Sequence, residues 1–431
     1  MNGKQDIEPT GPGTEESQPV VNLADPSKPF QVAEQDRQII DSSDLRPSSQ
    51  SSEFANPQPL VSPPFSFQIL HTDGPARSGR LQTSHGSIET PVFMPVGTQA
   101  TVKGLTPVQV REAGASIILA NTYHLTLRPG DELIAEQGGL HKFMGWNAPI
   151  LTDSGGFQLY SLAQCRKISD QSAVFRSHID GALLELSPER AVEIQENLGS
   201  DIAMCLDECP TFGIAPEYLR EAVQRTILWA QRCKARQRRP DQALFAIVQG
   251  GTDIELRRAC ASALVAMDFP GYALGGFSVG ETPVQMMKAL EPSTALLPQD
   301  RPRYLMGVGR PQDILAAVAC GVDMFDCVLP TRNGRNASAF THDGPLRMRN
   351  AQFKRDPAPV ESGCDCYTCR TFSRAYLHHL FLAGEMLGPT LLSLHNVHYY
   401  LRLMAEVREA IRVGRFDQYR GVRLARWRTA P

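Results

Sequence analysis

The sequence predicts an α/β fold of the TIM (β/α)8 barrel type, with a zinc-binding subdomain inserted near the C-terminus at about residues 340–400. Three observations lead to this prediction. Eight short apolar runs alternate with helical patterns, a polar residue or glycine follows most of the runs, and three cysteines fall within six residues near the C-terminus. Strands that alternate with helices in this way are typical of parallel sheets with helical crossovers.

The eight apolar runs are the predicted barrel strands. They are residues 92–96, 116–120, 150–152, 202–206, 244–248, 272–275, 304–307 and 322–325. A further strand is expected at residues 65–70, where apolar and polar residues alternate. Helices are expected at residues 188–198, after Ser187 as N-cap and with Pro188 first, and at residues 216–238. Eight strand–helix units indicate a TIM barrel, and a doubly wound open sheet is the alternative.

Residues at the ends of six predicted strands form the candidate active site. They are Asn121, Asp153, Asp207, Gln249, Gly276 and Asp326. In a TIM barrel the carboxyl ends of the strands meet on one face, and the active site lies on that face. Asn, Asp and Gly also favour ordinary turns, so each position alone is weak evidence. The three carboxylates together favour a functional site.

Composition predicts a cytoplasmic protein with neither a disulfide framework nor a membrane partner. The ten cysteines are mostly scattered through apolar segments, and there is no secretory signal and no run of roughly 20 apolar residues. Residues 1–63 carry 4 Lys and Arg against 10 Asp and Glu, a net charge of −6, which leaves 39 against 36, or +3, for the rest. A mildly basic body is compatible with a nucleic-acid partner.

The first 63 residues differ from the remainder in composition as well as in charge. Pro, Ser, Gln and acidic residues dominate them, and no apolar periodicity is sustained. Such a segment buries too little apolar surface to offset the entropy of ordering. We therefore expect a disordered acidic extension at residues 1–63 and one folded domain at residues 64–431.

A cysteine cluster near the C-terminus predicts a metal site. Cys364, Cys366 and Cys369 offer soft thiolates at a spacing that suits tetrahedral zinc, which requires a fourth ligand. His378 and His379 lie in a helical pattern, whereas His395 follows an apolar stretch and is the expected ligand. Four protein ligands leave no position open for water, so one structural Zn2+ per chain is expected. Three buried cysteines without a metal are the alternative.

Two of the strand-end carboxylates have surroundings that indicate chemistry. Asp153 begins the run DSGGFQ, whose glycines let a ligand approach the backbone closely. Asp326 precedes a loop with Arg332 and Arg335, which can hold phosphate. Two carboxylates that face one site can divide the nucleophilic and acid/base roles at a glycosidic carbon. The alternative for the arginines is a solvated loop.

Seven ordered motifs run through the predicted domain. They are DSGGFQ from Asp153, MCLDECP from Met204, VQGG from Val248, GGFSVGE from Gly275, YLMGVG from Tyr304, DCVLPTR from Asp326, and the cysteine cluster with the distant His395. From about residue 65 to the C-terminus the chain resembles bacterial tRNA-guanine transglycosylases. The resemblance implies exchange of guanine at the wobble position of tRNAs with GUN anticodons (Asp, Asn, His and Tyr). The incoming base is 7-aminomethyl-7-deazaguanine (preQ1), a precursor of queuosine.

The resemblance also implies roles for individual residues. Asp326 is the expected nucleophile, which attacks the ribose anomeric carbon and forms a covalent RNA–enzyme intermediate, and Asp153 is the expected proton donor and acceptor. Two inversions then give net retention, as in a retaining glycosidase. Arg310, Arg332 and Arg335 are expected to contact tRNA phosphates. Members of the family form homodimers, so a homodimer is expected here.

By the same resemblance, five residues form the pocket for the base. Asp207 matches the position that accepts the N–H donors of a guanine-like base, and Gln249 and the amide of Gly276 match those that bind its carbonyl oxygen. Phe157 and Met306 match the positions that sandwich the base. Without the resemblance, plain core is the better interpretation of these last two residues.

The motif around the incoming base departs from the family at one place. Phe277 and Ser278 stand where members usually carry Leu-Ala, which puts a bulkier side chain beside the aminomethyl pocket. The backbone contact from Phe277 is expected to remain. Val279 and Cys209 match the bacterial form and favour preQ1, with queuine as the alternative incoming base.

Two other functions fit parts of the sequence. A zinc-dependent TIM-barrel hydrolase or methyltransferase needs an open three-ligand metal site, and no strand end carries one. A noncatalytic tRNA-binding paralogue would lack one of the two carboxylates, whereas Asp153 and Asp326 are both present. The sequence therefore favours the enzyme.

Overall fold

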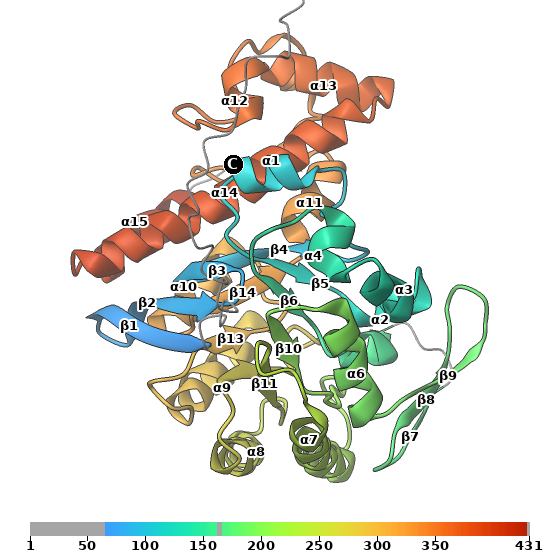
Figure 1. Cartoon of the computed structure of the whole chain (residues 1–431). Coiled ribbons are helices and arrows are strands. Elements are labelled where there is room, and N and C mark those ends of the chain that lie inside the picture. Colours follow the sequence, from blue (N-terminus) through green and yellow to red (C-terminus); the bar gives the residue numbers. More distant parts are fainter. Residues whose placement is uncertain (1–64, 162–165, 429–431) are drawn as a thin grey trace, which may run out of the picture. The chain divides into compact units, whose positions relative to one another are not determined.

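The computed structural model describes residues 65–161 and 166–428. Within them, eight parallel strands close into a barrel in the order β10-β11-β12-β13-β14-β4-β5-β6, and helices surround it (Figure 1). The predicted TIM barrel is confirmed, and the doubly wound open sheet is excluded. The predicted disordered extension at residues 1–63 lies outside the described residues and stays a prediction.

All eight predicted runs are barrel strands. They are β4 (Val92–Gly97), β5 (Ile118–Ala120), β6 (Ile150–Thr152), β10 (Ile202–Met204), β11 (Ala243–Val248), β12 (Gly271–Leu274), β13 (Arg303–Leu305) and β14 (Met324–Cys327). β14 closes the barrel on β4 with Phe325 opposite Phe93. Short apolar runs are expected here, because helices cover the outside of a parallel barrel and side chains fill its interior. Asp326 lies inside β14 rather than after it, which corrects the prediction.

Helices connect the successive barrel strands. They are α1 (Pro107–Glu112), α2 (Thr122–Leu127), α3 (Asp131–Glu136), α4 (Gly139–Met144), α5 (Gly156–Ser161), α6 (Pro188–Leu198), α7 (Pro216–Arg236), α8 (Ile254–Ala266), α9 (Pro283–Ala295) and α10 (Pro311–Ala319). α6 begins as predicted, because the Ser187 side chain accepts from the amide of Arg190 and Pro188 is in the first turn. α7 ends at Arg236 rather than at residue 238, because Gln237 leaves the helical conformation.

Two antiparallel sheets flank the barrel. β1 (Ser66–Asp73), β2 (Ala76–Thr83) and β3 (Gly86–Thr90) form the first, of which only β1 was expected. This sheet closes the amino end of the barrel: Leu81 and Ile88 pack with the barrel interior, and Arg77 donates to the buried Asp323 directly before β14. β7 (Arg166–Ile168), β8 (Ala173–Arg176) and β9 (Leu183–Leu186) form the second, between α5 and α6.

The cysteine cluster lies in a segment between β14 and the last barrel helix. The segment comprises α11 (Leu329–Arg335), β15 (Ser338–Ala339), β16 (Leu346–Arg347), the 3-10 helix η1 (Ala351–Arg355), α12 (Tyr367–Thr371) and α13 (Arg374–Ala383), and the chain continues as α14 (Leu387–Arg412) and α15 (Phe416–Arg428). α14 contacts α11 and α12 at one end and β1, β2 and β4 elsewhere, so one long helix joins this segment to the barrel (Figure 1).

The stretch with Arg332 and Arg335 is the helix α11, not the predicted loop. Pro330 suits the first helical turn, where its missing N–H costs nothing. Gly334 allows close packing on α14, because a Cβ at this position would lie 2.6 Å from the backbone of Ser393. The two arginines are therefore held on a packed helix.

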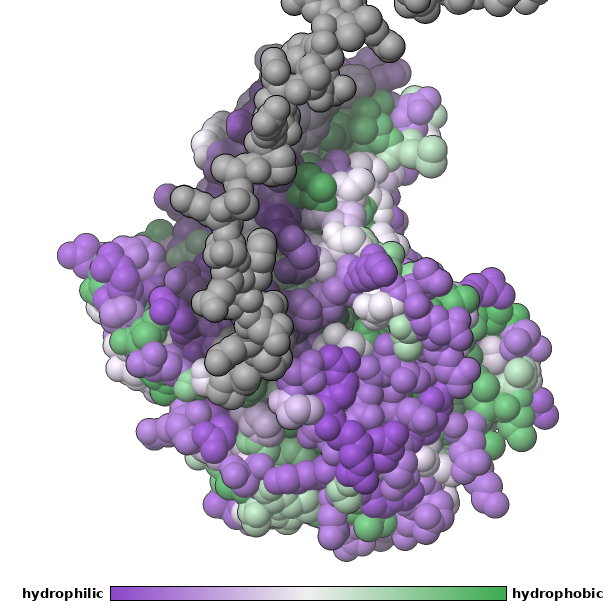
Figure 2. Space-filling model, in the orientation of Figure 1, coloured by the Kyte–Doolittle hydropathy of each residue, from purple (hydrophilic) through white to green (hydrophobic). Residues whose placement is uncertain are grey.

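No helix in residues 65–161 and 166–428 combines the length and the apolar character needed to cross a bilayer. Figure 2 shows a mostly hydrophilic surface on the visible face of this part of the chain, with apolar residues in smaller patches.

Candidate active site and metal centre

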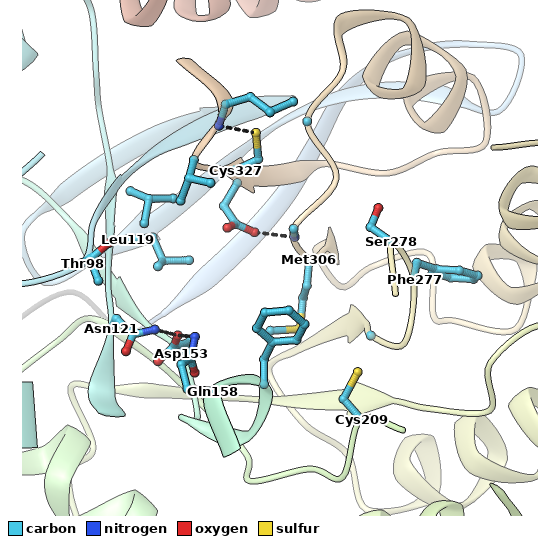
Figure 3. Close-up of a pocket in the computed structure, with 18 of the residues that line it drawn as sticks. Thr98, Leu119, Asn121, Asp153, Gln158, Cys209, Phe277, Ser278, Met306 and Cys327 are labelled. Atoms are coloured by element: carbon cyan, nitrogen blue, oxygen red, sulfur yellow. Dashed lines mark hydrogen bonds between the residues drawn. The ribbon is translucent and has the colours of Figure 1, made fainter. Parts of the chain in front are cut away.

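A pocket of about 680 Å³ opens at the carboxyl ends of the barrel strands (Figure 3). It is lined by both predicted catalytic carboxylates and by all the predicted base and tRNA contacts, namely Asp153, Phe157, Asp207, Gln249, Gly276, Phe277, Met306, Arg310, Asp326, Arg332 and Arg335. Residues from across the sequence thus meet on the face where a TIM barrel places its chemistry. The structure brings these residues together around one pocket, and their roles stay a prediction.

Asp326 is held by two donors. The hydroxyl of Tyr304 and the backbone amide of Gly307 both donate to its Oδ1, at 2.6 and 2.8 Å. Burial raises the pKa of the Asp326 carboxyl, and these two hydrogen bonds act in the opposite direction. The YLMGVG motif contains both donors, although the sequence alone did not indicate that they orient this carboxylate.

Asp153 lies on the other side of the pocket and accepts hydrogen bonds from several amide groups. It accepts from the side chain of Asn121, from the amide of Thr122 at 2.8 Å and from Nε2 of Gln158 at 3.3 Å (Figure 3). Burial raises the pKa of Asp153 to about 7, and the negative charge of Asp326 adds to the rise. Near neutral pH the proton of Asp153 is therefore easily gained and lost.

Asp207 is a third buried carboxylate. It accepts from the hydroxyl of Ser154 at 3.0 Å and from Nε2 of Gln249 at 2.7 Å, and burial raises its pKa to about 6. Gly156 is required beside it, because a Cβ there would lie 2.6 Å from the carbonyl oxygen of Asp207. An amide nitrogen carries two hydrogens, so Gln249 can donate to Asp207 and to a ligand together.

The backbone at Gly276 and Phe277 forms another wall of the pocket. Gly276 has a φ of +69°, and a Cβ there would lie 2.4 Å from Oε1 of Gln249, so no other residue fits without strain. The ring of Phe277 is buried beneath the guanidinium of Arg257, 3.7 Å from its centroid, and points away from Met306 (Figure 3). Arg257 also donates to the carbonyl of Gly275 at 2.9 Å. No pattern in the sequence indicated that this arginine is buried.

The predicted tRNA contacts form a positive rim. Arg310 precedes α10 and is exposed, as is Arg332 on α11. Arg335 is partly buried, and its Nη1 has no hydrogen-bond partner among the described residues. Desolvation and the neighbouring Arg332 lower the pKa of Arg335.

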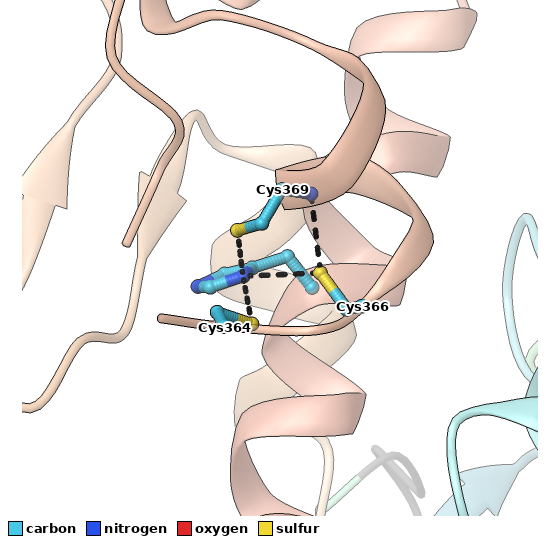
Figure 4. A group of neighbouring side chains, drawn as sticks. Cys364, Cys366 and Cys369 are labelled. Carbon is cyan, nitrogen blue, oxygen red and sulfur yellow. Dashed lines mark hydrogen bonds between the residues drawn. The ribbon is translucent and has the colours of Figure 1, made fainter. Parts of the chain in front are cut away.

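Cys364, Cys366, Cys369 and His395 meet in one buried cluster, as predicted (Figure 4). Nδ1 of His395 lies 3.8, 3.6 and 3.3 Å from the three sulfur atoms in that order. Ligand atoms around a tetrahedral zinc ion are separated by roughly 3.5 Å, so the donor set and its spacing fit this metal. Nε2 of His395 lies 2.8 Å from the carbonyl of Phe340, which orients the ring toward the sulfur atoms.

The raised pKa of Asp153 predicts a pH-dependent stability. The folded pKa of about 7 exceeds the ordinary value of 3.8, so the folded state binds this proton more tightly than the unfolded chain, and the stabilisation present below pH 4 is lost as pH rises to 7. Between pH 5 and 8 the wild type should lose about 2–3 kcal/mol more free energy of unfolding than Asp153→Asn. Urea unfolding at both pH values measures this difference. Parallel pH profiles for the two proteins would contradict the assignment.

Comparison with known proteins agrees with this geometry. Residues 72–429 match the family model described as queuine tRNA-ribosyltransferase. A protein named queuine tRNA-ribosyltransferase from Symbiobacterium thermophilum is 56% identical over 364 residues, which cover 84% of this chain and 91% of that protein. One with the same name from Thermus thermophilus is 54% identical over 356 residues, covering 83% of this chain and 92% of its own length.

The closed barrel carries two buried carboxyls in one pocket, and a separate Cys3His cluster that could hold a metal ion lies outside that pocket. The chain belongs to the queuine tRNA-ribosyltransferase family, whose members are transferases of the pentosyl type. The resemblance in the seven motifs is thereby confirmed.

Proposed function

We propose that this protein exchanges guanine at the wobble position of tRNA for a 7-deazaguanine base, in queuosine synthesis. The observation that carries the proposal is the pair of buried carboxyls, Asp153 and Asp326, in one pocket of a chain from this family. Their surroundings differ, as two roles require. Asp326 is fixed by donors on a single oxygen, whereas the pKa of Asp153 is raised to about 7.

In the first half of the reaction, the ionised Asp326 attacks the ribose anomeric carbon. Tyr304 and Gly307 hold Oδ1, which leaves Oδ2 for the attack. The bond to guanine breaks, its electron pair leaves with the base, and the protonated Asp153 gives the base a proton. The RNA is then joined to Asp326 through an ester of the anomeric carbon.

In the second half, the incoming base reverses these steps. Asp153, now ionised, takes the proton from the ring nitrogen of the base, and this nitrogen attacks the anomeric carbon. The ester bond breaks and Asp326 is regenerated as a carboxylate. The two displacements invert the centre twice, so the ribose keeps its configuration and the RNA backbone stays intact.

Base recognition follows from the walls of the pocket. The ring N–H and exocyclic amine of a guanine-like base are donors, and the carboxylate of Asp207 is their acceptor. The second N–H of Gln249 and the amide of Gly276 bind the carbonyl oxygen of the base. Phe157, which is 47% exposed, and Met306 cover its two faces, as for a base taken out of its stack.

The amide groups near Ser278 support preQ1 as the incoming base. The amides of Ser278 and Val279 both donate to the carboxylate of Glu281, at 2.5 and 3.0 Å. In a trans peptide the carbonyl points opposite to the N–H, so the carbonyl of Phe277 points away from Glu281. That carbonyl is the proposed acceptor for the aminomethyl ammonium group.

The tRNA partner is held by the positive rim. Arg310, Arg332 and Arg335 bind phosphates of the anticodon loop, and the loop bases are unstacked so that the wobble guanine enters the pocket. The proposed substrates are the tRNAs with GUN anticodons.

Incorporation of labelled guanine into a GUN anticodon stem-loop tests this function. We expect incorporation by the wild type, stronger inhibition by preQ1 than by queuine, and no incorporation into a loop with adenine at the wobble position. Absence of incorporation would overturn the proposed reaction. Stronger inhibition by queuine would overturn only the choice of incoming base.

We further propose that the Cys3His cluster holds one structural zinc ion per chain. The ligand set supports zinc, because thiolates and imidazole at tetrahedral spacing leave no open position for substrate. When bound, the ion would link the cysteines at α12 to His395 on α14. α14 in turn packs against α11, which carries Arg332 and Arg335. Zinc therefore supports RNA positioning rather than the exchange itself.

Replacement of one ligand should remove the metal and weaken RNA binding. For Cys369→Ser we expect loss of the bound zinc by elemental analysis, a lower thermal midpoint and a raised KM for the stem-loop, with a smaller change in kcat. Cys320→Ser is the matched control, because this cysteine is free and lies outside the cluster. Full zinc content in Cys369→Ser would show that the cluster is not the site.

A homodimer is also proposed. Exposed apolar and aromatic side chains gather on α12, α13 and the start of α14, namely Tyr367, Tyr376, Leu382, Met386 and Leu387, of which Met386 is 85% exposed. Such a surface is typical of a contact with another protein surface. Sedimentation should give twice the chain mass at micromolar concentration, and a monomer would contradict this proposal.

A further inference from the structure

A cluster of rings lies at one edge of the pocket, outside the base site. Tyr123 and His124 belong to α2, directly after β5, and His178 belongs to the turn between β8 and β9. The rings of Tyr123 and His178 are stacked with centroids 5.5 Å apart, and His124 meets His178 edge-on, also at 5.5 Å. The hydroxyl of Tyr123 and Nδ1 of His178 are 2.9 Å apart, a hydrogen bond that fixes the exposed imidazole.

The turn that carries His178 is closed by its own hydrogen bonds. The amide of Gly181 donates to the carbonyl of Ser177 at 2.9 Å, and the amide of Ser177 donates to Ala182 at 2.8 Å. The side chain of Asp180 accepts from the amide of Ala182 at 3.2 Å. The β8–β9 hairpin therefore presents His178 from a defined turn against α2, beside the pocket.

His124 is the member of this cluster that lines the pocket. Its Nδ1 is buried and has no hydrogen-bond partner in the part of the chain that the structure describes. Burial, His178 and Lys103 all lower the pKa of His124, which favours the neutral imidazole.

The cluster continues the positive rim around the barrel. Arg310 follows β13, Arg332 and Arg335 follow β14, the exposed Lys103 follows β4, and His124 follows β5, and these strands are consecutive neighbours in the barrel. The base-reading residues Asp207 and Gln249 lie beyond β6, on β10 and β11 and their loops. A strand of RNA laid along the cations therefore reaches the imidazoles at one end of the rim.

We propose that His124, held edge-on against the stacked pair of His178 and Tyr123, stacks on a nucleobase adjacent to the exchanged guanine, and that Lys103 binds the phosphate beside it. This inference rests on the proposed function, because the ligand is the anticodon loop of the same RNA. Unstacked RNA bases are commonly held on aromatic rings and histidine, and every base offers a flat face for such contact. His124, His178, Tyr123 and Lys103 thus position RNA and take no part in the transfer of protons.

Steady-state guanine exchange with modified stem-loops tests the proposal. His124→Ala should raise the KM for the intact stem-loop by roughly 5- to 150-fold with a smaller change in kcat, and His124→Phe should stay within about threefold of the wild type, because it keeps a ring. His178→Ala should also raise the KM for the intact stem-loop. His71→Ala, at an exposed position on β1, is the matched control and should leave KM unchanged.

A stem-loop with an abasic nucleotide on one side of the guanine identifies the stacked base. At the position that stacks on His124, base removal should raise the wild-type KM, and His124→Ala should then add less than about twofold. A purely structural role would give the same loss on intact and abasic RNA, and that result would overturn the proposal. Failure of the wild type to exchange guanine would instead overturn the proposed function.

Discussion

Replacement of Asp326 by alanine should abolish guanine exchange, with a loss of at least roughly 10³-fold, while the affinity for tRNA stays within about fivefold. The carboxylate is held by Tyr304 and Gly307, and in residues 65–161 and 166–428 no other carboxylate accepts from these two donors. RNA affinity should survive, because the cations at Arg310, Arg332 and Arg335 remain. Single-turnover incorporation of labelled guanine and filter binding of the stem-loop measure the two quantities.

Asp300→Ala is the matched control for this variant. Asp300 is exposed and precedes β13 at the amino end of the barrel, opposite the pocket. The Asp300→Ala variant should exchange guanine at the wild-type rate. Exchange by Asp326→Ala at a comparable rate would remove this residue from the reaction.

Replacement of Asp153 by asparagine should give a protein that binds tRNA and turns over poorly, with exchange lower by roughly 10²- to 10⁴-fold. Asparagine keeps the shape of the side chain but cannot carry the proton that guanine and the incoming base require. Asn121 and Thr122 then face a neutral amide instead of a carboxylate. Initial rates of guanine exchange, measured from pH 5 to 9, give the loss of activity.

The pH profile separates this role from a structural one. In the wild type, exchange should depend on a group that titrates near the raised pKa of Asp153, which is about 7. The pH profile of Asp153→Asn should lack this titration, because the titrating group is gone. Normal turnover by the asparagine variant, or an unchanged profile, would exclude Asp153 as the proton carrier.

Most of the barrel could be predicted from the sequence, because parallel strands covered on both faces are apolar throughout. The runs ending before Asn121 and Asp153 are examples, and both residues lie at the carboxyl ends of β5 and β6. The sheet of β1–β3 was mostly missed, since β2 contains Arg77 and Arg80 and resembles a polar loop. Arg77 is in fact buried on Asp323, a long-range pair that local patterns cannot reveal.

The candidate site was predicted as a set of positions, and its supporting contacts were not. Tyr304 points from β13 to Asp326 on β14, which depends on the pairing of these two strands rather than on sequence spacing. Arg257 lies on α8 and reaches the carbonyl of Gly275 after β12, again between neighbouring units. α11 was taken for a loop because its Pro330 and Gly334 are typical loop residues, and packing on α14 outweighs that local preference.

The most direct test of the account is the covalent bond between Asp326 and RNA. Wild-type protein mixed with a GUN stem-loop and denatured in acid should yield an RNA–protein adduct on a denaturing gel, and peptide mass mapping should place the ribose on Asp326. The adduct should be absent with Asp326→Ala and should disappear from the wild type when excess preQ1 is added before denaturation. An adduct on another carboxylate, or exchange that proceeds without any adduct, would contradict the double displacement at Asp326.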